Sequence, residues 1–339
     1  MKKIIVALSI LFPVLGIIGS VYFLLFKVED LTKVTNFIFF DIQPYYFLKF
    51  NISIVTERID EYTYSSASLG LLNVFFYLSF ITGAIIYQLS NYKDSRLLNF
   101  NYSLMFFYSI FKIIYFIIYV NEDNYNFQFM QIIYLSLTIF YLFMCYYFIT
   151  KHLNIITYNE NSTESDNSNP LKASGYKRFL NLIIDTFIIL LIASNLIGYA
   201  ERNNLFTVFF DGLKSFFGDQ LGLFVFFWIL KFIYYIIFES LFKSTPGKYL
   251  TGCYVIDDND EEASISLILK RTLFRFIPFE SFSFLTGRNL HDDSSYTYVV
   301  NTNRSTKTDL KYFFILAIAF SIMLIIYFYN MSQDRHFYY

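Results

Sequence analysis

Long apolar stretches separated by short polar segments dominate the sequence. A bilayer core of about 30 Å needs roughly 20 apolar residues of helix, so an apolar window of this length predicts a membrane span. Such windows occur at 4–26, 69–90, 102–120, 127–149, 179–200, 221–242 and 312–330. The pattern predicts an all-α polytopic membrane protein with about seven transmembrane helices.

The first window has two interpretations. Lys2 and Lys3 precede it, as positive residues precede the apolar centre of a secretory signal peptide. Its apolar run of about 23 residues is longer than the roughly 7–15 residues of such a centre. Gly16, Gly19 and Ser20 lie inside the run and form no small-x-small cleavage site after it. We expect a retained helix, with cleavage as the alternative.

The distribution of Lys and Arg predicts the orientation, because cytoplasmic loops carry an excess of both residues. With the N-terminus inside, 17 of the 26 Lys and Arg lie on the cytoplasmic side, seven lie outside, and Lys112 and Lys231 fall within windows. Seven spans then place the C-terminus outside. We expect a multi-pass protein of the cell membrane, a bacterial inner membrane, with a cytoplasmic N-terminus.

Composition agrees with a lipid environment and argues against one class of partner. Of the 339 residues, 56% are hydrophobic and 16% are charged, a balance that soluble domains of this size do not keep. The net charge is -1, and Lys and Arg form no dense run outside the loops beside helices, so nucleic acid is not expected as a partner. The expected partners are the lipid bilayer, a small ion or solute, and a second copy or another membrane protein.

A polar stretch divides the chain into two halves. Residues 158–170 are rich in Asn, Ser, Thr and acidic residues, a composition typical of a flexible linker. We expect an N-terminal four-helix membrane region of unknown family over 1–157 and a second membrane domain over 171–303. A C-terminal transmembrane helix with its tail follows over 304–339.

Ionisable residues near or inside the apolar windows are the candidate functional residues, because a charge facing lipid costs about 2.5–3.5 kcal/mol on insertion scales. Arg178 and Asp185 are seven positions apart, close to two helical turns, so both lie on one helix face. They form either a structural clasp, or Asp185 is a cation or proton site. Lys231 lies in the middle of another window and has Asp185 as its predicted partner, and Glu239 lies near the end of that window.

The polar region after residue 242 is predicted to lie in the cytoplasm and to contain a turn and two short strands. Pro246-Gly247 predicts the turn. Tyr254–Ile256 and Thr297–Val300 carry the β-branched and aromatic residues that strands favour. Gly247-Lys248 does not belong to a phosphate-binding loop, because Phe242 stands where that motif requires a glycine.

Residues 264–285 predict a basic amphipathic helix that lies in the membrane interface. Lys270, Arg271 and Arg275 stand among Leu, Ile and Phe residues, which is the pattern of such a helix. Pro278 is expected to end it. The segment that follows is predicted to be interfacial or re-entrant.

The sequence predicts neither a catalytic centre nor a bound cofactor. Cys145 and Cys253 have no partner at the spacing of metal ligands, and His291 has no second His at such a spacing. No Ser/His/Asp order, no paired catalytic carboxylates and no glycine-rich cofactor motif can be assembled. We therefore expect no enzyme, no metal and no cofactor.

Four features, taken in order, resemble the RDD (Arg-Asp-Asp) family of bacterial membrane proteins. No single feature is specific, and their order and spacing carry the resemblance, which covers roughly 171–303. It implies that the family's Arg and two Asp correspond to Arg178, Asp185 and Asp292. The four features are Arg178 with Asp185, the Thr245–Lys248 turn leading to Val255-Ile256, the pair Arg271 and Arg275, and His291-Asp292 before Thr297–Val300.

The resemblance implies a transport role, which for some family members includes sodium/proton exchange. We expect transport or binding of a small solute or ion, with Asp185 and either Glu239 or Lys231 lining a polar path. The alternative is a membrane scaffold or assembly protein without transport activity, in which the charged residues lock helices together. The family's helix number does not transfer, because the stretch between Arg275 and His291 is too short and polar for a span.

Overall fold

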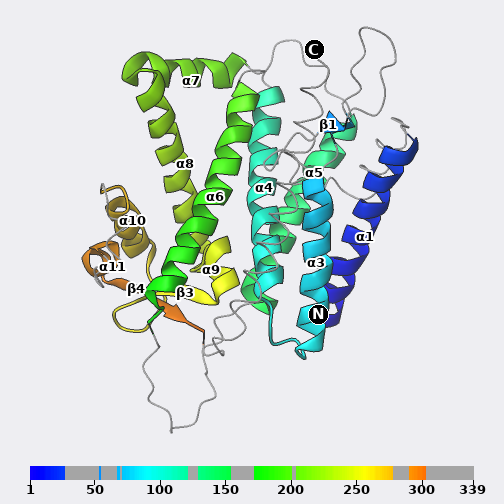
Figure 1. Ribbon diagram of the computed structural model, residues 1–339, viewed down its shortest axis with the longest axis horizontal. Helices are drawn as coiled ribbons and strands as arrows, with labels where there is room; N and C mark the ends of the chain where they lie inside the picture. The colour runs from blue at the N-terminus through cyan, green and yellow to red at the C-terminus, as the bar shows by residue number, and fades with distance from the viewer. Residues whose placement is uncertain are drawn as a thin grey trace, which may run out of the picture.

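The structure is a computed structural model of the chain. It describes residues 1–26, 53–54, 67–68, 71–120, 129–153, 172–200, 204–277 and 290–302. Within these residues the protein is mostly helical, and its long helices run side by side as a bundle (Figure 1). A helix occupies each of the six apolar windows from 4–26 to 221–242. The window 312–330 and the linker 158–170 lie outside the described residues.

The N-terminal half contributes four long helices to the bundle. The helix α1 packs against α3. The Ser9 hydroxyl of α1 is hydrogen-bonded to the Tyr102 hydroxyl of α4 at 2.7 Å. A two-residue antiparallel pair, β1 (Ser53–Ile54) and β2 (Ala67–Ser68), lies between them in sequence. The helices are α1 (Lys2–Phe26), α3 (Leu71–Leu89), α4 (Arg96–Val120) and α5 (Phe129–Tyr147), and α5 continues as the π-helical turn η2 (Phe148–His152).

The C-terminal half combines two long helices with a small α/β unit at one end of them. The long helices are α6 (Gly175–Ala200) and α8 (Asp219–Phe242), with α7 (Asn204–Phe217) between them. The small unit follows α8 and consists of α9 (Pro246–Thr251), β3 (Cys253–Asp257), α10 (Ile265–Phe274), α11 (Leu290–Ser295) and β4 (Thr297–Asn301).

The helix α7 was not predicted, because its 14 residues are too few for a span. It crosses the end of α8 (Figure 1). Gly218 forms the turn with φ +82°, and a Cβ atom at Gly222 would lie 3.1 Å from the backbone of Leu213. The rings of Phe210 and Phe226 then meet edge to face at 5.4 Å. Small residues therefore allow the close approach of α7 to α8.

Both predicted strands are present, and they pair with each other. β3 and β4 are antiparallel, with Cys253 opposite Asn301 and Asp257 opposite Thr297. The predicted turn at Pro246-Gly247 is a short helix, α9, because Pro246 occupies its first turn and the Thr245 hydroxyl accepts the Lys248 backbone N–H at 3.4 Å.

The amphipathic helix predicted at 264–285 is α10, and it ends at Phe274. Its orientation differs from the prediction: Arg271 is buried, and the side chain of Arg275 is only 9% exposed. Buried carboxylates draw both guanidinium groups inward. A basic helix in the membrane interface would turn its basic side chains toward the headgroups. In the structure Lys270 is exposed, but both arginines point into the protein.

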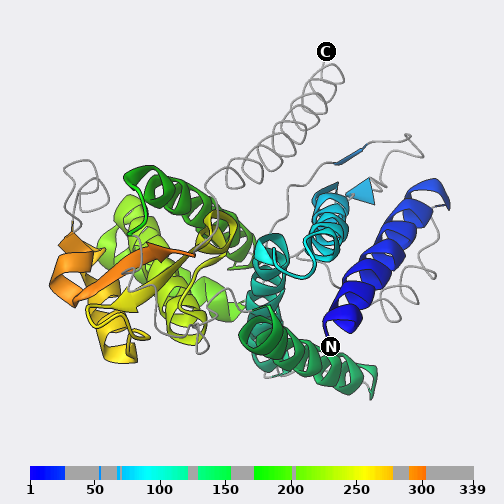
Figure 2. The same cartoon turned by 90° about the horizontal axis from the view of Figure 1, so that it is seen from below.

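One continuous apolar core joins the two halves. The ring of Phe106 on α4 meets that of Phe242 on α8 at 5.1 Å, and Phe107 meets Phe238 at 5.3 Å. Figure 2 shows α4 between the C-terminal half and the remaining N-terminal helices. At this contact, Gly252 has φ +65°, and a Cβ atom there would lie 3.3 Å from the buried Arg96 guanidinium. Gly252 therefore leaves room for Arg96.

Two helices of the described chain are long and apolar enough to cross a membrane, by length and composition. They are residues Arg96–Ile114 within α4 and Asp219–Phe242, which is α8. The window of α8 has a mean hydropathy of 2.2, yet only 33% of it is buried. Large apolar side chains such as Leu221, Phe224 and Trp228 are exposed on its surface. An apolar helix with so much exposed surface is typical of lipid contact.

Candidate functional site

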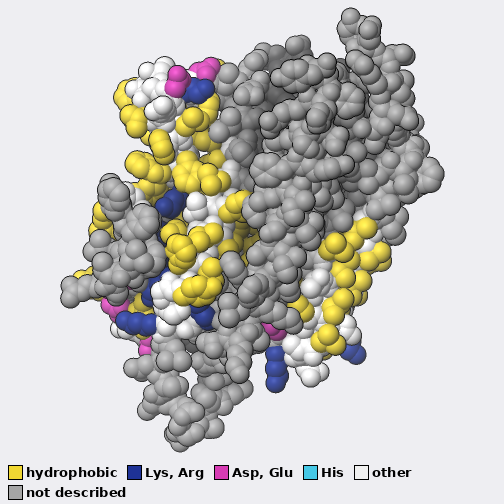
Figure 3. All heavy atoms as spheres, in the orientation of Figure 1, with side chains coloured by type: hydrophobic (Ala, Val, Ile, Leu, Met, Phe, Trp, Pro, Cys, Tyr) yellow, Lys and Arg dark blue, Asp and Glu magenta, His cyan; other side chains and the backbone are white. Residues whose placement is uncertain are grey.

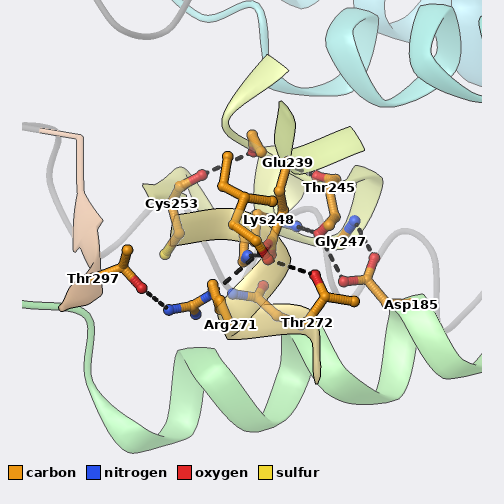
Figure 4. A network of polar contacts seen from close by, with 12 residues as sticks. Asp185, Glu239, Thr245, Gly247, Lys248, Cys253, Arg271, Thr272 and Thr297 are labelled. Carbon is orange, nitrogen blue, oxygen red and sulfur yellow. Dashed lines mark hydrogen bonds and ion pairs between the residues drawn. The ribbon is translucent and has the colours of Figure 1, made fainter. Parts of the chain in front are cut away.

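Asp185 on α6 is buried and holds the start of α9 (Figure 4). Its Oδ1 atom accepts the Tyr234 hydroxyl at 2.8 Å and the Gly247 backbone N–H at 3.0 Å. Its Oδ2 atom accepts the Thr245 hydroxyl at 2.6 Å. Three uncharged donors from α8 and α9 therefore surround one carboxylate, which ties three elements together.

The position next to Asp185 requires glycine. A Cβ atom at Gly247 would lie 2.8 Å from Asp185 Oδ1 and 3.0 Å from the Asn181 carbonyl oxygen. One turn along α9, the Thr251 hydroxyl donates to Asn181 Oδ1 at 2.5 Å. The backbone of α9 thus lies directly against α6, and donors already occupy the space around the Asp185 carboxylate.

Glu239 on α8 is fully buried and is surrounded by cations. Its Oε1 atom accepts Lys248 Nζ of α9 and, at 2.7 Å, Arg275 Nη2, while Arg271 Nε lies 3.4 Å from Oε2. The Arg275 guanidinium also stacks on the Tyr235 ring, with its Cζ 4.0 Å from the ring centroid. One carboxylate therefore draws α9 and α10 onto α8.

Asp292 on α11 is the second carboxylate of this cluster. It accepts Arg178 of α6 through Oδ2 and Arg271 of α10 through Oδ1, and His291 Nε2 lies 3.2 Å from Oδ1. Arg271 also donates to the Thr297 hydroxyl at 2.8 Å. Arg271 therefore bridges Asp292 and Glu239. We name the connected set the charge network: Arg178, Glu239, Lys248, Arg271, Arg275 and Asp292.

The charge network contains more cations than carboxylates. Its four basic side chains face the carboxylates of Glu239 and Asp292, and the buried carboxyl group of Asp185 also lies near Lys248. Burial and the nearby Arg271 hold the pKa of His291 well below its usual range, so His291 adds no charge at neutral pH. Burial lowers the pKa of Lys248 to about 8, although Glu239 opposes this shift. Lys248 is therefore the member of the network closest to losing its proton near neutral pH.

The structure rearranges the pairs predicted from the sequence. The clasp between Arg178 and Asp185 is wrong, because Arg178 pairs with Asp292 and Asp185 binds uncharged donors. The two residues lie on one helix, but α11 brings a carboxylate to Arg178 from 114 positions away. Lys231, the other predicted partner of Asp185, is partly buried on α8. The side chain of α8 that donates to Asp185 at 2.8 Å is Tyr234.

Sequence reasoning missed the roles of Tyr234, Thr245 and Lys248. Tyr234 is one of many tyrosines in apolar windows, so composition does not distinguish it. The Thr245–Lys248 segment did contain a signal for a helix start, because an N-cap residue, a helix-starting proline and a glycine follow one another there. Among the described residues, no group of three or more His, Cys, Asp or Glu side chains is arranged to hold a metal ion.

Comparison with known proteins places this site in a family. Residues 172–337 match the sequence model of the family described as the RDD family. The match includes every residue of the charge network and Asp185, and it continues beyond residue 303, where the resemblance of the motifs ended. No curated protein and no solved structure matches the chain.

Proposed function

Because the chain belongs to the RDD family over residues 172–337, we propose that it is a multi-pass membrane protein that binds or transports a small ion or solute. In this proposal seven helices span a bacterial inner membrane, α1 is retained, the N-terminus is cytoplasmic, and the C-terminus is outside. The helices in all six described windows and the exposed apolar surface of α8 support it. The proposal includes no enzymatic reaction.

The observation that carries the proposal is the environment of Glu239. A carboxylate that is 0% exposed lies in an apolar helix and binds three cations from α9 and α10. Buried ion pairs rarely stabilise a protein more than well-packed apolar residues would. Ionisable residues at membrane depth usually mark functional sites. Arg271 contacts both Glu239 and Asp292, so the charge network can shift pairs without leaving a charge unpaired.

Asp185 has a different role in this proposal. Its carboxylate already accepts three hydrogen bonds of 2.6–3.0 Å, and Gly247 lies directly against it. An ion would have to displace these donors to reach it. Asp185 is therefore the fixed anchor of α9 on α6. Glu239 also has its partners in place, but one of them, Arg271, also contacts Asp292, so in this proposal Glu239 is the residue whose partners change when the solute binds.

Flux into liposomes that contain the purified full-length protein tests the proposal. Uptake of sodium, potassium and protons is measured for the unmodified protein, for Glu239→Gln, and for Glu261→Gln as a control at an exposed carboxylate. We expect Glu239→Gln to lower flux per folded molecule by about tenfold or more, equivalent to about 1.4 kcal/mol. Equal flux in Glu239→Gln and the unmodified protein would remove Glu239 from the path.

A scaffold or assembly function is the second candidate, and the anchoring of Asp185 favours it. Asp185 joins α6 to α8 and α9 through hydrogen bonds from three uncharged donors, which is what a rigid structural joint requires. A cysteine at Lys231 separates the two functions. A polar path predicts reaction of Lys231→Cys with a water-soluble maleimide in membranes, whereas a scaffold predicts protection and no flux above that of empty liposomes.

A further inference from the structure

The helix α10 and the turn that follows it carry an apolar stripe on the side opposite Arg271 and Arg275. Ile265, Leu269, Leu273 and Ile277 follow one another at intervals of four residues and are 42–68% exposed. Arg271 and Arg275 point the other way, into the charge network. A helix on an aqueous surface normally shows the reverse arrangement, with charged side chains outward.

The contacts of α10 show how far it extends along α8. At its start, Lys243 Nζ, just beyond the end of α8, donates to the Ala263 carbonyl oxygen at 3.0 Å. Beyond its end, the ring of Phe276 lies 5.9 Å from Phe232 and 6.1 Å from Trp228. Phe276 is therefore far from the end of α8 at which α10 begins.

The rise per residue of a helix gives the position of Phe276 along the axis of α8. Phe232 and Trp228 precede Phe242 by 10 and 14 residues, which corresponds to about 15 and 21 Å at 1.5 Å per residue. The whole of α8 is about 36 Å long by the same measure. Phe276 thus reaches the middle of α8, and Figure 1 shows α10 beside α8, on the α7 side of β3 and β4.

We propose that α10 and the residues up to Ile277 enter the hydrocarbon of one leaflet beside α8, with the stripe from Ile265 to Ile277 against lipid acyl chains. The helix α10 packs against α8, whose exposed apolar side chains include Phe224 and Trp228. Figure 3 shows hydrophobic side chains on the surface of this part of the molecule. The occupant is lipid because this surface continues directly into the surface of a helix that is long and apolar enough to span.

The arginines make this position possible. Arg271 and Arg275 have their charges satisfied by Glu239 and Asp292 on the protein side, so neither guanidinium group faces the acyl chains. The exposed Lys270 beside the stripe has a long side chain that extends its ammonium group toward the headgroups. Lipid pressed against the stripe would hold Arg271 between Glu239 and Asp292. The bilayer is thus a structural partner of the charge network.

Depth-dependent quenching tests the proposal with the full chain in proteoliposomes. Single cysteines at Leu269 and Leu273 are labelled with bimane, and the unmodified protein gives the background from the buried Cys145 and Cys253. Because the bromines lie in the hydrocarbon core, we expect bromolipid to quench both labels at least about threefold more than a label at the exposed Glu261. Aqueous iodide should show the reverse order.

The controls separate this inference from the membrane placement of α8. A label at Phe224, exposed on α8, should be quenched by bromolipid. Iodide quenching of Leu273 equal to that of Glu261, with Phe224 in lipid, would overturn the position of α10 alone. Iodide quenching at Phe224 as well would overturn the proposed span of α8. Protection from both quenchers, with a disulfide between two Leu273→Cys copies, would replace lipid by a second copy.

Discussion

Replacement of Asp185 by Asn distinguishes the observed arrangement from a clasp with Arg178. The carboxylate accepts hydrogen bonds from Tyr234, Thr245 and Gly247. The amide of the Asp185→Asn variant keeps the shape of the carboxylate, but its NH2 group cannot accept a hydrogen bond and faces at least one of these donors. Loss of one hydrogen bond to a charged group costs about 1.5–3 kcal/mol. We therefore expect the free energy of unfolding of Asp185→Asn to fall by about 2–3 kcal/mol.

Double-mutant cycles then show which residues share this energy. Arg178 binds Asp292 instead of Asp185, so the effects of Asp185→Asn and Arg178→Gln should add within about 0.5 kcal/mol. Thr245→Val removes a direct partner of Asp185, so its effect should be non-additive with Asp185→Asn by about 1 kcal/mol or more.

The measurement is reversible unfolding of the full-length protein in mixed micelles, followed by far-UV circular dichroism and tryptophan fluorescence. A coupling of about 1 kcal/mol or more between Arg178 and Asp185, which is within the range for contacting residues, would refute the geometry described above if Asp185 and Thr245 were additive. Unchanged stability of Asp185→Asn would refute the anchoring role itself.

Three further predictions concern packing, pH and topology. Gly247→Ala should destabilise the protein by about 1–3 kcal/mol because its Cβ would lie 2.8 Å from Asp185 Oδ1. The control Gly212→Ala on α7, whose Cβ would meet nothing within 4 Å, should leave the stability unchanged. Thermal unfolding in detergent measures both effects. Burial lowers the pKa of His291, so the unfolded state binds a proton more readily. Stability should therefore fall as the pH drops below about 6.5, the unfolded value. The melting temperature of His291→Asn should depend less on pH in this range, and an equal dependence would contradict a neutral His291 in the folded protein. Reporter fusions should indicate the cytoplasm after Lys93, Asn161 and Asn259 and the outside after Tyr339, and a cytoplasmic signal after Tyr339 would contradict seven spans.

Local sequence was sufficient to predict most of the elements. The windows near 69–90 and 221–242 became α3 and α8 because a run of about 20 apolar residues satisfies its own backbone hydrogen bonds only as a helix. The strands at Tyr254–Ile256 and Thr297–Val300 were also predicted, because β-branched and aromatic residues favour extended backbone. The order of motifs around Arg178 and Asp292 indicated the family that the comparison then identified.

Tertiary structure alone decided which charges meet. Periodicity places Arg178 and Asp185 on one face of α6 but does not indicate that α11 brings Asp292 to Arg178. The basic pattern of α10 predicted an amphipathic helix in the membrane interface, but it did not indicate that the buried Glu239 turns Arg271 inward and that the apolar stripe is left exposed. Helix periodicity depends on neighbours within a few residues. The partner of a buried charge depends instead on which distant carboxylate the packing brings within reach. A buried charge needs such a partner because leaving it unpaired in the core costs more free energy than any local preference supplies.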